Sequence, residues 1–341
     1  MTGTAGTPLP PYFLGVDGGG SKTDALILDG RGMVLGKGRS GRGNYHTAGM
    51  AEVIANARSA IGQAVAEAQT SGADLSGTGS LALESAAFCM AGADLPQDFT
   101  RLREAFTALP LGCSFEVYND VIGIFRAGSR FPYGVGVVCG TGFNAGGVDQ
   151  HGRELRFPAL GGFTGDRAGG DHLAIEAVGA AFRAWDGRGA PTLLEGAILR
   201  LWQKPDYLTL AADYENGTIS ADQMRALVPL LFETAAAGDA LAQGIIREQG
   251  LELSTAALTM LRCLDLLGTD CDVVLGGGVF RAANPLLTDT IRDQLASAAP
   301  QVVVQRLNQP PVVGAALLAA DRCAYPTGDG FLATLRKQMA L

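Results

Sequence analysis

The residues best suited to chemistry in this chain lie in one glycine-rich stretch near its beginning. Residues 15–30 read GVDGGGSKTDALILDG, with an aspartate, three consecutive glycines and the run Ser21, Lys22 and Thr23. Glycines let a backbone approach a ligand closely, and neighbouring amides and hydroxyls can donate hydrogen bonds to phosphate oxygens. The stretch therefore predicts a loop that binds phosphate groups.

This stretch differs from a P-loop in both spacing and context. Its order, G-x-x-x-x-G-S-K-T, has one residue more than the G-x-x-x-x-G-K-T of a P-loop. A P-loop leads into a helix whose N-terminus completes the phosphate site. Residues 23–30, TDALILDG, instead alternate like a strand and end in a turn. We therefore expect the glycines to bend a hairpin, which would make this a phosphate loop of another kind.

A second glycine-rich hairpin is predicted in the middle of the chain. Residues 133–155, YGVGVVCGTGFNAGGVDQHGREL, contain an apolar strand, a glycine turn and a second strand. They end in a turn at 149–152 that echoes the turn at 29–32. Self-similarity at half the chain length constrains a whole fold, and here it predicts two half-chains that open alike.

Strand and helix patterns extend both halves. After each opening of three short strands we expect alternating helices and strands, which gives two βββαβαβ units. In the first half the helices are expected at 50–69 and 96–109 and from 121, and the strands at 12–17, 23–30, 33–38, within 80–94 and at 113–120. In the second half the helices are expected at 171–187, 221–238, 240–268, 284–298 and 311–320, and the later strands at 271–278 and 301–307.

Composition limits the class of protein. The 341 residues allow two domains, and the 47% apolar and 18% charged content is typical of a folded protein. No apolar run approaches the about 18 residues that a membrane span needs. A net charge of −8 disfavours nucleic acid as a partner. The first residues lack the features of a signal peptide, so a cytoplasmic location is expected.

Cysteines and histidines do not suggest a metal site. The six cysteines show no C-x-x-C pair, and the three histidines are not clustered. Most of the cysteines lie in apolar stretches, where we expect them to pack as small hydrophobic residues.

Five motifs in order carry a family resemblance. They are GVDGGGSKT, NDVIG, GVVCGTGFNAGG, LGGFTGD and VVLGGGVF. Together they resemble the BadF/BadG/BcrA/BcrD ATPase family, and within it the N-acetylglucosamine kinase-like branch, from about residue 12 to 320. The resemblance implies an α/β protein of the actin-like ATPase (hexokinase/ribonuclease H-like) fold, with two duplicated βββαβαβ domains around a cleft. We expect a loose tail at 1–11, a first domain at 12–120, and a second at 121–341 with helical insertions, whose last helix can pack back on the first.

The resemblance also implies how ATP and Mg²⁺ would be held. Asp17 would hold Mg²⁺ through water. The first loop would face the phosphates of ATP, a second loop would complete the phosphate site, and a third segment would lie along the adenosine. The residues of these three segments are Gly18, Gly19, Gly20, Ser21, Lys22 and Thr23; Gly140, Thr141 and Gly142; and Gly276, Gly277 and Gly278. The resemblance does not give Lys22 the role that the lysine of a P-loop has in binding phosphate.

The acceptor side of the reaction is implied by further matches. Asp120 follows an apolar strand and precedes a helix, and by resemblance it would take the proton from a sugar 6-hydroxyl. Either Asp120 or Asn119 could instead serve as a helix N-cap. The residues implied in sugar binding are Asn44, Asn119, Asp120, Gly161, Gly162 and Asp166. The last segment departs from the family pattern, with Phe163 where tryptophan is usual, which leaves the identity of the sugar open.

Three functions compete at this point. The first is an ATP- and Mg²⁺-dependent kinase that makes the 6-phosphate of N-acetylglucosamine or a related amino sugar. The second is an ATPase that activates a CoA-ester reductase or dehydratase through an iron–sulfur cluster, which would need cysteine ligands near the second loop. The third is a nucleotide- or sugar-binding regulator without turnover. A homodimer is the default assembly for any of them.

Overall fold

The structure is a computed structural model that describes residues 11–75, 81–282 and 284–339. The chain divides into two compact units. Unit 1 comprises residues 1–134, 150–152 and 307–341, and unit 2 comprises residues 135–149 and 153–306. Of the tail expected at 1–11, only Pro11 lies within the described residues. No helix in the described ranges combines the length and the hydropathy needed to cross a bilayer.

Unit 1 is built on a five-stranded sheet of order β3-β2-β1-β4-β5. Its strands are β1 (Tyr12–Gly18), β2 (Thr23–Asp29), β3 (Val34–Ser40), β4 (Ser85–Met90) and β5 (Ser114–Asn119). The first three strands pair antiparallel as a meander, while β4 and β5 run parallel to β1. The carboxyl ends of β1, β4 and β5 therefore lie at the same edge of the sheet, where α/β ligand sites gather.

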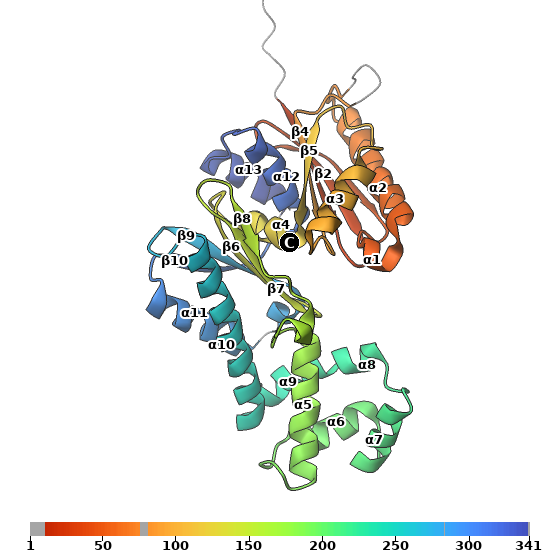
Figure 1. Ribbon diagram of the computed structural model, residues 1–341, viewed down its shortest axis with the longest axis vertical. Helices are drawn as coiled ribbons and strands as arrows, with labels where there is room; N and C mark the ends of the chain where they lie inside the picture. The colour runs from red at the N-terminus through yellow and green to blue at the C-terminus, as the bar shows by residue number, and fades with distance from the viewer. Residues whose placement is uncertain (1–10, 76–80, 283, 340–341) are drawn as a thin grey trace, which may run out of the picture. The chain divides into compact units, whose positions relative to one another are not determined.

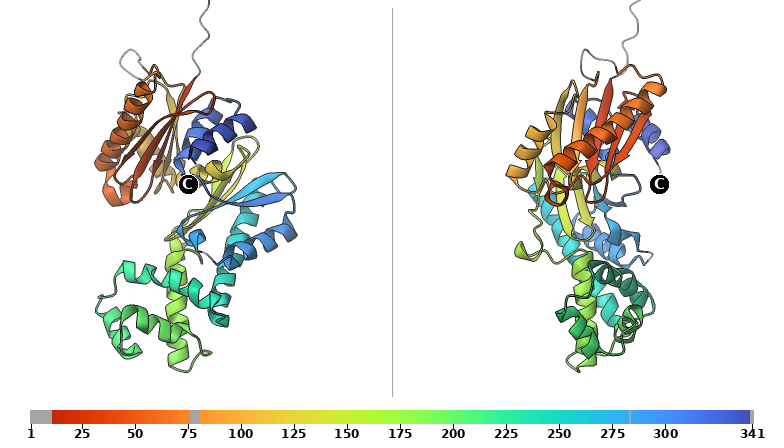
Figure 2. Two further views of the ribbon diagram at one scale, coloured as in Figure 1. Left: turned by 180° about the vertical axis from the view of Figure 1, so that it is seen from behind. Right: turned by 90° about the vertical axis from the view of Figure 1, so that its right-hand side faces the viewer.

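Helices cover both faces of this sheet (Figures 1 and 2). One face packs against α2 (Met50–Thr70) and α3 (Pro96–Phe106), and the other against α4 (Asp120–Gly128), α12 (Val312–Arg322) and α13 (Asp329–Met339). The strand pattern explains this arrangement because successive side chains alternate between faces. Leu14 and Val16 belong to the α2 core, while Leu26 and Leu28 belong to the α12 core.

The exposed edge of the sheet is closed by side chains. The outer strand β3 would present unpaired amides, which are a template for unwanted pairing. Here the N–H of Lys37 donates to Glu67, that of Arg39 donates to Gln63, and that of Val34 donates to Gln338. Helices α2 and α13 thus supply the acceptors that a neighbouring strand would otherwise provide.

Helix α4 belongs to unit 1, which corrects the boundary expected after Asp120. The division falls after Gly134 because α4 packs against α12. The fully buried Arg126 of α4 donates to both carboxylate oxygens of Asp321, at 2.6 and 3.1 Å. A buried guanidinium needs such a bidentate partner. Helices α12 and α13, although last in the chain, therefore complete the core of unit 1.

Unit 2 repeats the strand order of unit 1. Its sheet has the order β10-β9-β6-β7-β8, formed by β6 (Gly134–Cys139), β7 (Phe143–Val148), β8 (Glu154–Arg156), β9 (Cys271–Gly276) and β10 (Val302–Arg306). In both sheets the third, second, first, fourth and fifth strands of the unit follow one another. The expected duplication of βββαβαβ units is confirmed.

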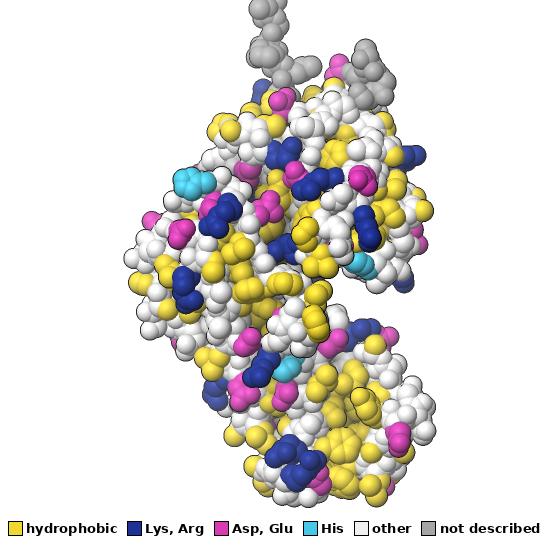
Figure 3. All heavy atoms as spheres, viewed as in Figure 1, with side chains coloured by type: hydrophobic (Ala, Val, Ile, Leu, Met, Phe, Trp, Pro, Cys, Tyr) yellow, Lys and Arg dark blue, Asp and Glu magenta, His cyan; other side chains and the backbone are white. Residues whose placement is uncertain are grey.

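The helices of unit 2 exceed those expected from the sequence. They are α5 (Gly170–Trp185), α6 (Leu194–Trp202), α7 (Tyr207–Glu215), α8 (Ala221–Arg225), α9 (Leu227–Ala236), α10 (Ala240–Cys263) and α11 (Leu286–Ala298). Helices α6 and α7 were not predicted, and the single helix expected at 221–238 is two, joined at Ala226. Hydrophobic side chains gather on the surface over these helices (Figure 3). Leu208 and Tyr214 of α7 are 69% and 73% exposed.

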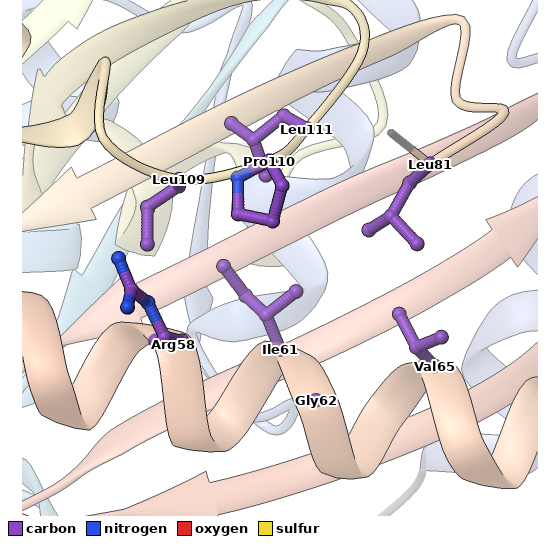
Figure 4. Close-up of a pocket in the computed structure, with 8 residues that line it drawn as sticks. All are labelled: Arg58, Ile61, Gly62, Val65, Leu81, Leu109, Pro110 and Leu111. Atoms are coloured by element: carbon purple, nitrogen blue, oxygen red, sulfur yellow. The ribbon is translucent and has the colours of Figure 1, made fainter. Parts of the chain in front are cut away.

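An apolar cavity of about 330 Å³ lies between α2 and the loop of residues 109–111 (Figure 4). Ile61 and Val65 of α2 face the loop of Leu109, Pro110 and Leu111 across it. Arg58 at its rim donates to the Ala108 carbonyl. None of the described residues lining this cavity carries a carboxylate or hydroxyl group, so we place no acid–base chemistry in it.

The crossing of α4 and α12 depends on Gly314. A Cβ atom there would lie 1.8 Å from the carbonyl oxygen of Gly123, whereas one at Gly244 in α10 would meet no atom within 4 Å. We expect Gly314→Ala to destabilise the protein by about 3 kcal/mol, as overpacking does, and Gly244→Ala to stabilise it by about 0.5–1 kcal/mol. Urea unfolding of both variants measures the difference. Equal effects would contradict this account of the crossing.

Candidate active site

Asp17 lies one residue before the carboxyl end of β1 and is buried. It is 8% exposed, and it lies opposite Asp24 in the β1–β2 register. Burial raises the pKa of Asp17 to about 7, and the charges of Asp120 and Asp24 add to the effect, while Lys22 opposes it. The charges of two further carboxylates thus act on Asp17 at this edge of the sheet. Such a concentration of negative charge favours a cation.

The first glycine loop is a tight hairpin, as expected from the sequence. The N–H of Gly19 donates to the carbonyl of Lys22 at 2.8 Å, which leaves Gly20 and Ser21 exposed at the tip. A Cβ atom at Gly20 would meet no protein atom within 4 Å. The fold itself does not require this glycine. A ligand that approaches the backbone closely would explain why it is there.

Two members of the first loop are placed differently from the expectation. Thr23 is fully buried, and its Oγ1 has no hydrogen-bond partner among the described residues. Its hydroxyl therefore does not face solvent as a phosphate donor would. The Lys22 ammonium lies 2.5 Å from Asp24, whose carboxylate also binds Arg39. This ion pairing takes up much of the charge that Lys22 could offer to a phosphate.

Asp120 begins α4, directly after β5. The N-cap of α4 is Asn119, whose Oδ1 accepts the N–H of Val121 at 3.0 Å. Asp120 is therefore not needed for capping. The Asn119 amide nitrogen donates to the Ala93 carbonyl at 3.1 Å and to Asp94 at 2.9 Å. The Asn119 side chain is thus engaged by the protein through both its oxygen and its nitrogen, and it orients the start of α4. Its expected contact with a sugar stays a prediction.

Asn44 lies in a loop that is held against the first hairpin. It caps α1 (Tyr45–Ala48), accepting the N–H of His46 through Oδ1. The N–H of Gly43 donates to the Gly19 carbonyl at 2.8 Å. A Cβ atom at Gly43 would lie 2.4 Å from the Cα of Gly18. The loop that carries Asn44 thus packs directly on the backbone of the first glycine loop.

The second glycine loop lies in unit 2 and is hydrogen-bonded to the start of α5. The N–H of Gly170 donates to the Gly140 carbonyl at 2.8 Å, and that of Asp171 donates to the Thr141 carbonyl at 3.0 Å. Thr141 and Gly142 are exposed. Cβ atoms at Gly140 and Gly142 would meet nothing within 4 Å. These two glycines are left open in the same way as Gly20.

The third glycine segment adjoins the second loop. Gly277 has a φ of 104°, and a Cβ atom there would lie 2.3 Å from the Cys139 carbonyl oxygen. Glycine is therefore required at this position by conformation and by contact. Gly276 ends β9 and is buried, whereas a Cβ atom at Gly278 would meet open space. The structure brings the 140–142 and 276–278 segments together within unit 2.

A cavity that the sequence did not reveal lies between α9 and the chain that leads into α11. It has a volume of about 470 Å³. Its lining residues come from α9 and from the chain between β9 and α11, and they are Pro229, Phe232, Glu233, Ala236, Ala282, Asn284 and Pro285. Apolar walls with a few polar groups suit a flat heterocycle. The α9 residues have no motif of their own, so only the folded chain identifies them.

The segment implied in sugar recognition folds upon itself. Gly161 begins a 3₁₀ turn with a φ of 69°, and its N–H donates to Asp166 Oδ2 at 2.8 Å. Thr164 donates to the same oxygen at 3.0 Å. Gly161 and Gly162 are exposed, and Phe163 is 91% exposed. Among the described contacts, Asp166 serves its own loop, and its part in binding a sugar stays a prediction.

Two sheets of the same strand order, each covered by helices, define the actin-like ATPase fold. The crystal structure of a candidate N-acetylglucosamine kinase from Chromobacterium violaceum shares this fold. Its TM-score is 0.62 at 24% identity, over 92% of this chain and 100% of that one. Residues 14–319 match the model of the BadF/BadG/BcrA/BcrD ATPase family. The chain belongs to that family, as the five motifs indicated.

Two relatives align with this chain over nearly their whole length. An N-acetylmuramic acid/N-acetylglucosamine kinase of Clostridium acetobutylicum is 26% identical over 314 residues, which are 92% of this chain and 99% of that protein. An N-acetyl-D-glucosamine kinase of Dictyostelium discoideum is 27% identical over 320 residues, which are 91% of this chain and 98% of that protein.

The raised pKa of Asp17 predicts how stability depends on pH. The folded protein favours the neutral carboxyl group of Asp17. The resulting stabilisation of the folded state is complete below about pH 4, the pKa of Asp17 in the unfolded chain, and is lost as the pH rises through about 7. In metal-free buffer at pH 8 we expect Asp17→Asn to be more stable than the parent by up to about 4 kcal/mol, and to be less dependent on pH.

Thermal unfolding from pH 4 to 8 with a chelator measures this effect. Glu104→Gln, which alters an exposed carboxylate of the same unit, serves as the control and should follow the parent curve. Parallel curves for the parent and Asp17→Asn would show that Asp17 is ionised in the folded protein throughout this range.

Proposed function

We propose that this protein is an ATP-dependent sugar kinase that transfers the γ-phosphate of ATP to the 6-hydroxyl of N-acetylglucosamine or a related amino sugar. The observation that carries the proposal is the placement of Asp120. It stands at the carboxyl end of a parallel strand, relieved of helix capping by Asn119, and its charge acts on the buried Asp17. The two kinases that align over nearly their whole length support the choice of substrate class.

The proposed reaction moves one proton and one phosphoryl group. Asp120 accepts the proton of the sugar 6-hydroxyl as its oxygen attacks the γ-phosphorus. The new O–P bond forms as the bond from the γ-phosphorus to the bridging oxygen breaks, so ADP leaves and the sugar 6-phosphate remains. A positioned base of this kind contributes about 10²- to 10⁴-fold, and the rest of the rate enhancement comes from alignment and charge neutralisation.

The glycine segments fit the phosphate groups of ATP. Gly20, Gly140, Gly142 and Gly278 have open space where a side chain would be, so backbone amides can approach phosphate oxygens closely. We propose the cavity beside α9 for the purine, with Phe232 as an apolar wall and Glu233 and Asn284 as polar groups. We also propose that the protein acts in the cytoplasm, where it would use ATP.

The acidic edge of unit 1 fits a divalent cation. Asp17 would hold Mg²⁺ through water, because burial and two neighbouring carboxylates raise its pKa and so favour any added positive charge. When bound, the ion would neutralise charge on the phosphates. The Asp17 carboxylate supplies oxygen ligands of the hard type that Mg²⁺ prefers.

No observation favours the alternative of an electron-transfer ATPase. That function would need Cys139, beside the second loop, as a thiolate ligand of a cluster. Cys139 is buried, and burial raises the pKa of its thiol to about 12. Its Sγ instead lies 3.3 Å from Gln249 Nε2, within hydrogen-bonding distance. A regulator without turnover is separated from a kinase by measuring ADP release.

The decisive experiment is a screen of sugar-dependent ADP release. The panel comprises N-acetylglucosamine, glucosamine, N-acetylmannosamine, glucose and N-acetylmuramic acid, with Mg²⁺ and ATP. We expect turnover with one or more N-acetylated sugars, and phosphate on the 6-oxygen by NMR. ATP hydrolysis that no sugar stimulates would contradict the proposal.

Asp120→Asn should separate binding from chemistry. The amide cannot take the proton, so we expect kcat to fall by about 10²- to 10⁴-fold, while the Kd of ATP changes little. Calorimetric titration with ATP and the ADP-release assay measure the two effects. Glu104→Gln is the matched control. Undiminished turnover by Asp120→Asn would rule out Asp120 as the base.

We also propose a homodimer, since closed two-fold dimers are the commonest assemblies. Light scattering gives the mass in solution, and a monomer across the micromolar range would exclude the dimer.

A further inference from the structure

The short helix α1 cannot hold its own position. It has four residues, and none of them is buried. Helices of this length are unstable in isolation, because forming the first turn costs more than its few hydrogen bonds return. The place of Asn44, at the N-cap of α1, is therefore set by contacts with other segments of unit 1.

One of those contacts is a short hydrogen bond to a buried carboxylate. Tyr45 Oη donates to Asp98 Oδ1 at 2.5 Å, and Asp98 is 2% exposed. A weaker contact lies beside it, between His46 Nε2 and the Gly92 carbonyl at 3.1 Å. The charge-assisted hydrogen bond from Tyr45 to Asp98 thus joins the loop of Asn44 to α3.

The same carboxylate also holds the loop before α3. Asp98 Oδ2 accepts the N–H groups of Asp94 and Leu95 at 3.0 and 2.6 Å. Burial alone would raise the pKa of Asp98, but the hydrogen bonds from Tyr45 and from the two amides lower it below its usual value. Asp98 is therefore an ionised acceptor with three donors, which is the strong form of such an interaction.

The chain of contacts continues to the proposed base. The side chain of Asp94 accepts Asn119 Nδ2 at 2.9 Å, and Asn119 caps the helix that begins with Asp120. One buried carboxylate, Asp98, thus connects the N-cap of α1 to the start of α4. These segments are about 75 residues apart in the sequence, and all of them belong to unit 1.

We propose that Tyr45 and Asp98 are positioning residues that hold Asn44 and Asp120 at the separation the acceptor sugar requires. The inference rests on the proposed function, because it takes Asn44 as a sugar ligand and Asp120 as the base. Tyr45 acts on the sugar-binding end of the connection. Asp98 acts on both ends, because it also fixes the loop to which Asn119 is bonded.

The two positions should therefore give different kinetic effects. We expect Tyr45→Phe to raise the KM for the sugar about tenfold, which corresponds to the lower end of what a hydrogen bond to a charged group contributes. Its kcat and its KM for ATP should stay within about twofold of the parent. Asp98→Asn should raise the sugar KM and also lower kcat, because the new amide presents N–H groups to N–H donors.

Tyr207→Phe is the matched control. Tyr207 is a fully buried tyrosine of unit 2 whose hydroxyl donates to the Glu195 carbonyl at 2.9 Å. Its loss should lower the Tm without changing either KM. Since Tyr45→Phe keeps the ring and its packing, it tests the inference even if Asp98→Asn does not fold.

The outcomes separate this inference from the proposed function. A sugar KM within twofold of the parent in Tyr45→Phe, with a Tm loss like that of Tyr207→Phe, would leave Tyr45 a purely structural role and overturn the inference. An equal rise of both KM values would overturn it too, since it would reflect general loosening. If the parent shows no sugar-dependent turnover, the proposed function fails and the inference fails with it.

Discussion

The site in unit 1 depends on one electrostatic constraint, the burial of Asp17 beside two other carboxylates at a single edge of a sheet. Asp17 is the second-last residue of one strand, Asp120 follows another, and Asp24 faces Asp17 across the hairpin. Burial and mutual repulsion raise the pKa of Asp17 to about 7. A fold keeps such a costly arrangement when a ligand relieves it, as a divalent cation would. Arg39 and Lys22 form ion pairs with Asp24, and Asp17 is the carboxyl group of this edge whose pKa is raised.

The glycines of the site fall into two groups with different causes. Gly277 is fixed by its positive φ and by contact with Cys139, and Gly43 by its contact with Gly18. No neighbour or unusual φ explains Gly20, Gly140, Gly142 or Gly278. The first group builds the scaffold, and the second leaves room beside the backbone. A glycine-rich sequence does not distinguish the two groups, because the distinction lies in what surrounds each Cα.

Much of the fold could be predicted from the sequence because its signals were local. Apolar runs, the turn at 29–32 and its echo at 149–152 were enough to predict both meanders and the duplication. Helices α6 and α7 were missed because their apolar residues include exposed ones such as Leu208, which blur the helical period. The domain boundary was misplaced because the ion pair of Arg126 with Asp321 joins residues far apart in the chain.

The candidate site was predictable to the same extent: its local signals could be read from the sequence, and its contacts between distant residues could not. Asp17 and Asp120 stood out because each lies where a predicted strand ends, and ligand sites gather there. Which of Asn119 and Asp120 caps α4 could not be decided, since both types cap helices equally well, and only the bond from Asn119 to Val121 decides it. Thr23 looked like a phosphate ligand by its place after Ser21 and Lys22. Thr23 is buried because the loop of residues 43–44 packs against it. No sequence pattern predicts this contact.

The two duplicated hairpins differ in the residue that precedes the glycine turn, and this difference sets the charge beside each turn. The residue before the glycine turn is Asp17 in one hairpin and Cys139 in the other. Burial raises both pKa values, to about 7 for the carboxyl group and about 12 for the thiol. Near neutral pH the first can ionise and the second cannot. The same kind of hairpin therefore places a carboxyl group that can ionise in unit 1, where it suits a cation, and an uncharged thiol beside the second glycine loop in unit 2.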